Sequence, residues 1–513
     1  MNRIYFYVIF SLISFSAMAQ NESDLIRYLT PIKGIGAQSV GLGYSNTLIS
    51  NDNSSLFLNP AAVGMIKKTT LNVNLNYDGG SVKSTWLNNS TDLDFSNTKI
   101  NQFSMTYPYP VAQGSFVLAF GYGQTDNFDQ IVKGGGFNPT SSFVEGIGGY
   151  DPNDSIPKSR MKNYVNDRIA NDLFYEFGFE AYLLDSVYTG SNPNLGRIRS
   201  TVFGNVQQSY KSISEGGMNT WSFAVSTEIT KGIFAGVSAH FLNGDYYNQY
   251  YYTEKGDEEF YKSRSDSGII DRNGIKRVFS SFYMEEIVKE TISGYSVKFG
   301  LITKFDDELS GGVSFTLPTS LTVDTKKTVD LESQFINVNS SVDKIRIGTQ
   351  FPYDYSSKYE LSGASNLEVN VAYSGFPFIA EVGLSTMDWS NTRIKSSDDS
   401  DPYDDINDFF RFDTKRTWDA KAGVQYAVPF LQSFVRAGIY SQDSPYKSGG
   451  DRINRYSLGY QFLSADGYSI DFGYQYVNSS ESFTPYKPKY KPSVVNTEEK
   501  TLSLFSVAFS MKF

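Results

Sequence analysis

The sequence contains no cysteine and a single histidine, His240, among its 513 residues. Without cysteine, disulfide scaffolds, thiolate metal sites and lipid-anchored lipoproteins are excluded. Serine-histidine catalysis needs a nucleophile and an orienting partner beside the imidazole, and no motif places a serine or an acid next to His240. We therefore expect no catalytic residue, no metal site and no cofactor, and we predict that the protein is not an enzyme.

Long hydrophobic runs are also absent beyond the first residues of the chain. A membrane-crossing helix needs roughly 20 apolar residues, and the mean hydropathy is only -0.33, so an α-helical membrane protein is excluded. The net charge is -10, and no basic stripe is interleaved with aromatic residues. Nucleic acid is therefore not an expected partner.

Residues 1–19 have the layout of a secretory signal peptide. Arg3 supplies a positive start, a short apolar run follows, and Ala17-Met18-Ala19 forms a small-residue cleavage site before Gln20. The apolar run is too short to span a bilayer. We expect an exported protein, and the alternative is an uncleaved anchor.

Aromatic residues and glycine are abundant: 16% of the chain is aromatic, and it has 43 glycines. In the closing segment TLSLFSVAFSMKF, aromatic and apolar residues such as Phe505, Phe509 and Phe513 alternate with small or polar ones. A transmembrane β-barrel needs apolar residues only at alternate positions, so its overall hydropathy stays low. A secreted soluble β-protein shares this composition, but it would more often carry long charged side chains on the polar face.

The connections between the alternating segments differ in length. Tight turns alternate with long polar segments, and the strands between them number about fourteen, an even number as expected for bacterial outer-membrane barrels. We predict an all-β fold in which residues 68–513 form an antiparallel barrel. Its long extracellular loops are predicted at residues 126–216 and 254–292.

Residues 20–67 precede the first strand and show no consistent period. They include Gly34, Gly36, Gly41 and Gly43, but position 39 is serine, so the dinucleotide-binding fingerprint fails. A barrel of about fourteen strands is wider than side chains alone can fill. We expect this segment to plug the lumen, with glycines that allow close approach to the wall. The alternative is a disordered periplasmic extension.

Several motifs resemble the FadL/TodX family of outer-membrane hydrophobic-compound transporters. The hatch of that family reads G-x-x-x-x-G-x-G followed by N-P-A-G, and the matching residues here are Gly36, Gly41, Gly43, Asn59, Pro60 and Ala61, with Ala62 in place of the last glycine. The segments GLSTMDWSN (Gly383–Asn391) and WDAKAGVQYAVPFLQSFVRAGIYSQDSPY (Trp418–Tyr446) resemble later strands of the family. The likeness is weak across residues 126–216 and 254–292.

The resemblance implies a monomeric fourteen-stranded barrel with an N-terminal hatch. It further implies passive uptake of hydrophobic compounds such as long-chain fatty acids, with release sideways through a gap made by a kinked strand. The expected hatch residues are Gly34, Gly36, Gly41, Gly43, Asn59, Pro60 and Ala61; the ligand-binding residues are unknown. Expected partners are apolar solutes, outer-membrane lipid and lipopolysaccharide. The alternative is a FadL-like barrel that binds or assembles secreted or surface proteins.

Overall fold

The computed structural model describes residues 22–48, 53–146, 156–169, 173–189, 192–264, 268–348, 352–396, 403–448, 450–483, 485–486 and 494–513. The predicted signal peptide, residues 1–19, lies outside the described residues, as do residues 20–21 and 49–52 of the predicted plug. In the part of the chain that is described, no helix has the length and apolar character needed to cross a membrane.

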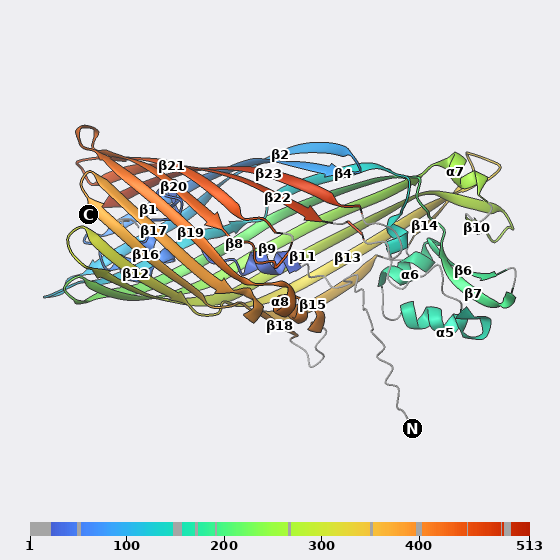
Figure 1. The fold of residues 1–513 in the computed structure, drawn as a ribbon, viewed down its shortest axis with the longest axis horizontal. Helices are drawn as coiled ribbons and strands as arrows, with labels where there is room; N and C mark the ends of the chain where they lie inside the picture. The colour runs from blue at the N-terminus through green and yellow to red at the C-terminus, as the bar shows by residue number, and fades with distance from the viewer. Residues whose placement is uncertain are drawn as a thin grey trace, which may run out of the picture.

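A single antiparallel sheet of twenty strands forms the main body (Figure 1). The uninterrupted wall strands are β1 (Thr70–Trp86), β2 (Asn89–Tyr109), β8 (Val206–Thr230), β9 (Ile233–Gly256), β11 (Lys276–Lys304), β19 (Arg416–Val428), β20 (Ser433–Gln442), β21 (Ile453–Leu463), β22 (Tyr468–Phe483) and β23 (Asn496–Lys512). Other wall strands contain a short break and carry two labels: β3 (Phe116–Asn127) with β4 (Gln130–Asn138), β12 (Leu309–Thr316) with β13 (Ser320–Asn337), β15 (Tyr353–Ser362) with β16 (Asn366–Gly375), and β17 (Phe378–Asp388) with β18 (Arg393–Ser396).

With each broken strand counted once, the wall has fourteen strands, as predicted. β1 pairs with β23 from Thr70↔Lys512 to Thr85↔Thr497, and this pairing closes the barrel. Closure satisfies the backbone hydrogen bonds that a sheet edge would leave open in lipid. Short connections join the strands at one end: residues 110–115, 231–232, 305–308, 376–377, 429–432 and 464–467.

The wall strands place apolar side chains outward and polar side chains inward. On β1, Leu75 and Tyr77 are exposed, whereas Asn74 and Asn76, which alternate with them, are buried. A soluble sheet would bury its apolar face, so this inverted alternation is the arrangement expected when lipid surrounds the wall and a polar lumen lies inside. The alternation in the sequence therefore predicted the correct orientation of the strands.

The outward apolar belt covers only the part of the barrel near the short connections. On β11, Phe299 and Tyr295 are exposed apolar residues, but the next outward residues, Ser293, Thr291 and Lys289, are polar. β11 has 29 residues, whereas about 9–11 are enough to cross a bilayer. The neighbouring long strands therefore continue well past the belt, to the right in Figure 1.

The predicted loops at residues 126–216 and 254–292 consist partly of strand, and this prediction was wrong in extent. β8 already begins at Val206, β9 continues to Gly256, and β11 starts at Lys276. The remaining elements are η1 (Phe143–Gly146), β5 (Ile156–Pro157), α5 (Lys158–Ile169), α6 (Leu173–Glu180), β6 (Leu184–Thr189), β7 (Asn192–Ser200), α7 (Glu258–Ser263), β10 (Ile269–Ile270) and β14 (Lys344–Gly348). Beyond the belt the outer face of a strand meets water, so the apolar alternation ends while the strand continues.

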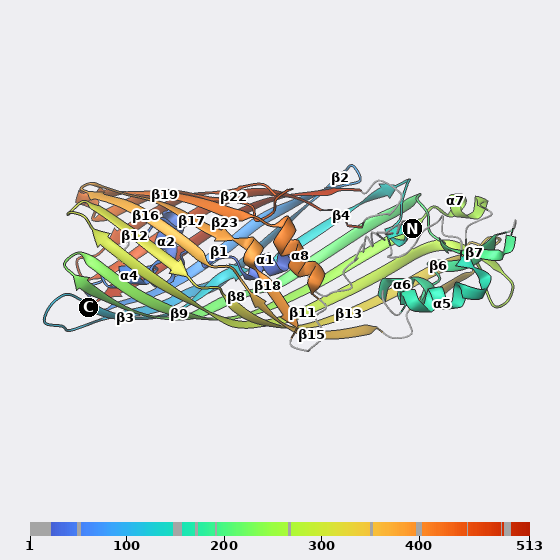
Figure 2. The ribbon, with the colours of Figure 1, turned by 60° about the horizontal axis from the view of Figure 1, so that its bottom comes forward.

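The N-terminal segment, residues 22–48 and 53–66, lies inside the barrel in both views (Figures 1 and 2). Its helices are short: α1 (Glu22–Tyr28), α2 (Ala37–Gly41), α3 (Ser55–Leu58) and α4 (Pro60–Val63). Leu25, Leu42, Leu56 and Phe57 are completely buried. The helix α8 (Asp404–Asp413) and the short turns η2 (Trp389–Asn391) and η3 (Pro429–Leu431) complete the fold.

A buried carboxyl group joins several elements in the extension beyond the belt. The Glu254 carboxylate accepts hydrogen bonds from Phe143 N at 2.8 Å, Gln208 Nε2 at 2.7 Å and the Tyr252 hydroxyl at 2.9 Å. It thereby ties η1 to β8 and β9. Burial raises the pKa of Glu254 to about 7. The protonated form is consequently favoured in the docked structure.

We expect residues 138–146 to be held less firmly as the pH rises from about 5 to about 8. A carboxyl whose pKa is raised by folding contributes stability below its ordinary value of 4.5, and this stability is lost as the pH passes about 7. The slope is at most about 1.4 kcal/mol per pH unit. Hydrogen exchange of residues 138–146 measures it. Glu254→Gln should remove the slope and Asp306→Asn, in a distant turn, should not; an unchanged slope in Glu254→Gln would contradict the assignment.

Candidate functional site

Glycines on the inner face of the wall make room for the N-terminal segment. A Cβ atom at Gly438 would lie 2.1 Å from Leu42 C, and one at Gly236 would lie 2.5 Å from Pro60 C. Other wall glycines that face the segment are Gly121, Gly123, Gly300, Gly312, Gly423, Gly459 and Gly473. Backbone therefore packs directly on backbone, and any larger residue would displace one of the two partners.

The four predicted glycines of the N-terminal segment take different parts in this packing. Gly36 has a φ of 101° and precedes α2, and Gly43 has a φ of 60°, so both adopt conformations that favour glycine. A Cβ atom at Gly43 would also lie 2.7 Å from Ile439 N in the wall. A Cβ atom at Gly41 would lie 2.9 Å from Gly459 Cα in the wall. A Cβ atom at Gly34 would instead meet Ser39 Oγ, which belongs to the N-terminal segment itself.

The Asn59-Pro60-Ala61 motif starts α4 against the wall. Asn59 Oδ1 accepts a hydrogen bond from Ala61 N at 3.0 Å, and Asn59 Nδ2 donates to Val313 O at 3.3 Å. Pro60 occupies the first turn of the helix, where its missing N–H costs nothing. Ser226 Oγ donates to Ala61 O at 3.1 Å. The structure brings the predicted residues together on this segment, and most of them contact the wall.

Buried charges of the wall hold the same segment, and sequence reasoning missed them. Lys298 Nζ donates to Phe57 O at 2.9 Å and to Leu58 O at 3.2 Å, the carbonyls that end α3. The Glu381 carboxylate accepts from Thr47 N at 3.1 Å and Leu48 N at 2.8 Å. These bonds satisfy backbone groups that a short segment leaves unpaired. The only sequence signal is that each charge lies at an inward position of a barrel strand.

Arg436 stabilises the wall beside α2. Its guanidinium is buried and donates to Asp471 at 2.6 Å, to Gln425 at 2.7 Å and to Gln461 at 2.7 Å. The three partners lie on β22, β19 and β21. A fully satisfied guanidinium of this kind fixes the relative positions of neighbouring strands at the point where the N-terminal segment packs on them.

Apolar residues surround α1 in the middle of the lumen. Leu25, Ile26 and Leu29 pack with a cluster contributed by wall strands and α8: Phe128, Met218, Leu242, Tyr246, Ile292, Leu321, Val323, Tyr359, Leu361, Ala364, Met387, Trp389, Ile394, Tyr403, Ile406 and Phe410. A cavity of about 30 Å³ lies between this cluster and His240. That volume holds one or two water molecules. A hydrocarbon would fit only after the N-terminal segment or its neighbours moved.

His240 is buried on the inner face of β9. Its Nδ1 lies 2.7 Å from Ser222 Oγ, and its Nε2 lies 2.9 Å from Ser238 Oγ. Sequence reasoning found no serine beside His240, and in this respect it was incomplete. Both ring nitrogens are taken by hydroxyls, so no carboxylate orients the imidazole as catalytic triads require.

In the described part of the wall, β2 and β4 are neighbours without backbone pairing. β2 pairs with β3 only from Gln102↔Gly123 to Tyr109↔Phe116, and its remaining residues pair with β1 alone. After the break at Phe128 and Asp129, β4 pairs only with β8. The unpaired stretch of β2 begins beside Ile100, the last outward apolar residue of that strand. We call the space between β2 and β4 the wall gap.

Polar side chains bridge the end of the wall gap that lies nearest to the apolar belt. Lys99 Nζ on β2 donates to Asn127 Oδ1 at 3.0 Å and lies 3.7 Å from Asp129 Oδ2. Asn97 Nδ2 also donates to Asp129. Asn127 Nδ2 in turn donates to Asp78 Oδ2 at 3.4 Å. These side-chain contacts replace the backbone ladder, and they can break without unfolding a strand.

Known proteins share the fold of this chain but little of its sequence. No protein-family model and no curated protein matches this chain. The toluene transporter TodX of P. putida superposes with a TM-score of 0.52 and 11% identity, over 94% of this chain and 99% of its own. A Pseudomonas aeruginosa FadL homologue superposes with a TM-score of 0.51 and 13% identity, over 93% and 98%.

This chain has the fold of the FadL/TodX transporters. The structural neighbours are transporters or channels and not enzymes. The fold likeness extends over nearly the whole chain and includes the regions where the sequence motifs were weak. It therefore confirms the predicted barrel.

The close packing of Gly438 against Leu42 leads to a testable prediction. We expect Gly438→Val to push α2 off the wall and to lower its protection from hydrogen exchange, because no wall atom can move away from a backbone contact. Gly311→Val, where the nearest atom is the flexible Phe305 ring at 3.0 Å, serves as the control. Both barrels should keep heat-modifiable migration on gels. Equal protection of residues 37–45 in the two variants would show that the contact does not hold the segment.

Proposed function

We propose that this protein is a monomeric outer-membrane transporter for passive uptake of hydrophobic compounds. The observation that carries the proposal is a barrel whose lumen holds residues 22–48 and 53–66 and whose wall lacks pairing between β2 and β4 at the edge of the apolar belt. An apolar solute that passes from one apolar cluster to the next avoids contact with water, which costs about 0.8 kcal/mol per CH₂.

In this proposal the N-terminal segment acts as the hatch. The small cavity beside α1 indicates a closed state, and movement of the segment would connect the apolar cluster with the wall gap. The solute would then leave sideways through the gap instead of crossing to the other end of the barrel. Lys99, Asn97 and Asp129 are the side chains that would separate at the exit.

The proposal also concerns the class of compound that the protein transports. The apolar cluster around α1 offers an extended surface that suits the acyl chain of a long-chain fatty acid, whereas the structural neighbour TodX is a toluene transporter. Uptake of radiolabelled oleate and of radiolabelled toluene by cells that express the protein, compared with cells that lack it, tests both classes. Absence of uptake for both, with the barrel present in the outer membrane, would overturn the transport proposal.

A second candidate is a role in binding or assembling secreted or surface proteins. It is favoured by the extension beyond the belt, where β6, β7, α5 and α6 form a separate small layer at the end of the long strands (Figure 2). Native mass spectrometry of the protein purified from membranes separates the two candidates. A stoichiometric protein partner supports this second role, and a co-purified apolar compound supports transport.

Deleting residues 22–66 should open the lumen. The wall strands pair with one another and not with this segment, so the barrel should still form. We expect large ion conductance in planar bilayers, which the intact protein should lack. Glu381→Gln together with Lys298→Met, which weakens the attachment without removing the segment, should give brief openings. A deletion variant that folds and stays closed would show that the segment is not the hatch.

A disulfide across the wall gap should block lateral release. Because the chain contains no cysteine, Asn97→Cys with Asp129→Cys introduces the only thiols. We expect oxidation to stop uptake and reduction to restore it. The control is Lys83→Cys with Glu499→Cys, which links β1 to β23 where the two strands are already paired and should leave uptake unchanged. Uptake that persists in the oxidised Asn97→Cys/Asp129→Cys variant would exclude the wall gap as the exit.

A further inference from the structure

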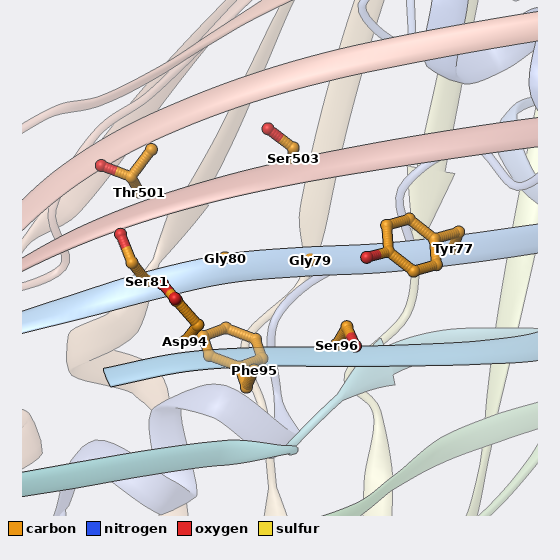
Figure 3. Close-up of a pocket in the computed structure, with 9 residues that line it drawn as sticks. All are labelled: Tyr77, Gly79, Gly80, Ser81, Asp94, Phe95, Ser96, Thr501 and Ser503. Atoms are coloured by element: carbon orange, nitrogen blue, oxygen red, sulfur yellow. The ribbon is translucent and has the colours of Figure 1, made fainter. Parts of the chain in front are cut away.

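A cavity of about 530 Å³ forms a groove in the barrel wall (Figure 3). It crosses three neighbouring strands, β2, β1 and β23, where the first and last wall strands meet. We call it the seam groove. It is separate from the lumen cavity beside His240 and shares no lining residue with it.

Two glycines and small hydroxyl residues make the groove hollow. Gly79 and Gly80 lie at its centre on β1, where neighbouring positions carry side chains. The Tyr77 ring leans over Gly79, so that a Cβ atom there would lie 3.2 Å from it. At Gly80 a Cβ atom would lie 2.5 Å from Thr501 O. Larger residues at these two positions would fill the groove or displace its walls.

The seam groove lies at the upper boundary of the apolar belt. Directly below it, the rings of Tyr77 and Phe505 lie 6.3 Å apart, and Leu75 and Val507 continue the exposed apolar surface downward. Above it, Lys83 and Glu499 form an exposed ion pair at 3.4 Å. Aromatic residues mark the interface of a membrane. The groove is therefore level with lipid headgroups, and the apolar belt below it is level with acyl chains.

The side chains in the groove favour a ligand rich in hydroxyl groups. Asp94 supplies a carboxylate, which only accepts hydrogen bonds when ionised, and Ser81, Ser96 and Ser503 supply hydroxyls that both donate and accept. Tyr77 presents an aromatic face against which the C–H side of a sugar ring can pack. The negative charge of Asp94 disfavours a phosphate at the same place. The combination fits a sugar better than a phosphate headgroup.

We propose that the seam groove binds the sugar headgroup of an outer-leaflet glycolipid, whose acyl chains run down the exposed face formed by Leu75, Tyr77 and Val507. This inference rests on the proposed outer-membrane location but not on transport. The continuous surface from groove to belt is what selects a lipid-linked sugar over a free one, since a free sugar would use the upper half alone. The bound lipid would lie next to the unpaired stretch of β2, on the outer side of the wall gap.

The test uses the full-length protein, purified in detergent, delipidated and titrated in native mass spectrometry with a short-core lipopolysaccharide from which the phosphates have been removed. Phosphatidylethanolamine and phosphatidylglycerol are titrated separately. We expect one lipopolysaccharide to bind at least tenfold more tightly than either phospholipid. Equal affinity for the phospholipids would show an ordinary lipid shell and overturn the proposal, and binding of the free core oligosaccharide with the same affinity would overturn it by showing a sugar site without a lipid.

Two variants locate the binding to the groove. Ser96→Trp fills the groove and Asp94→Ala removes its carboxylate, and each should weaken lipopolysaccharide binding at least tenfold. Ser293→Trp is the matched control, because Ser293 is also an exposed residue just above the belt, on β11. Heat-modifiable migration verifies folding of all three. Unchanged binding in both groove variants would exclude this site.

The outcomes for lipid binding and for transport are separable. Uptake of oleate or toluene by Ser503→Trp, which fills the groove from β23 and away from the wall gap, should equal that of the parent. A wild-type protein that binds lipopolysaccharide but takes up neither compound would overturn the proposed function and leave the groove proposal standing. The reverse result would overturn the groove proposal alone.

Discussion

The structure depends on one constraint: every backbone N–H and C=O group at the level of lipid must find its partner within the protein. The pairing of β1 with β23 meets this constraint by removing the sheet edges. It also sets the size of the lumen, because fourteen strands enclose more space than side chains of the wall can fill. The packing inside the barrel follows from that size.

The N-terminal segment contacts the wall in part through its backbone, whereas protein cores are packed mainly by side chains. Wall glycines such as Gly236 and Gly438 allow this approach, and Lys298 and Glu381 satisfy the peptide groups that short helices leave open. Direct contact gives specific placement, while the modest number of charged anchors keeps the segment separable from the wall. These are the two properties that the proposed hatch would need, because it would have to seal the lumen and also move.

At the wall gap, β2 and β4 do not form the backbone hydrogen bonds that join other neighbouring strands. Where the apolar belt ends, β2 keeps its backbone pairing with β1 but loses the pairing on its other side, and Lys99, Asn97 and Asp129 provide side-chain contacts there instead. Side-chain contacts can open one at a time, whereas a ladder of backbone bonds opens only with the sheet. The seam groove lies on the neighbouring strands, so the outer surface around the gap combines an apolar belt, a hydroxyl-lined hollow and a free strand edge.

The sequence by itself determined the barrel and the orientation of its strands, whereas the plug role of the N-terminal segment stays a prediction. Alternation such as Phe505, Val507 and Phe509 is a local property, and a period of two in lipid leaves one solution, a closed antiparallel sheet. The glycines from Gly34 to Gly43 and the Asn59-Pro60 pair were visible in the sequence as residues that permit special backbone conformations, and their part in gating stays a prediction.

Only the tertiary structure decided where the strands end and what holds the segment. Past the belt the outward residues of β8 and β11 include charged ones such as Lys211 and Lys289, so the alternation expected of a lipid-facing strand ends before the strand does, and residues 206–216 and 276–292 were taken for loops. The partners of Lys298, Glu381 and Asp129 lie far away in sequence, on the N-terminal segment or on β2. Such contacts depend on the shear and closure of the whole barrel, which bring together residues that no local pattern relates.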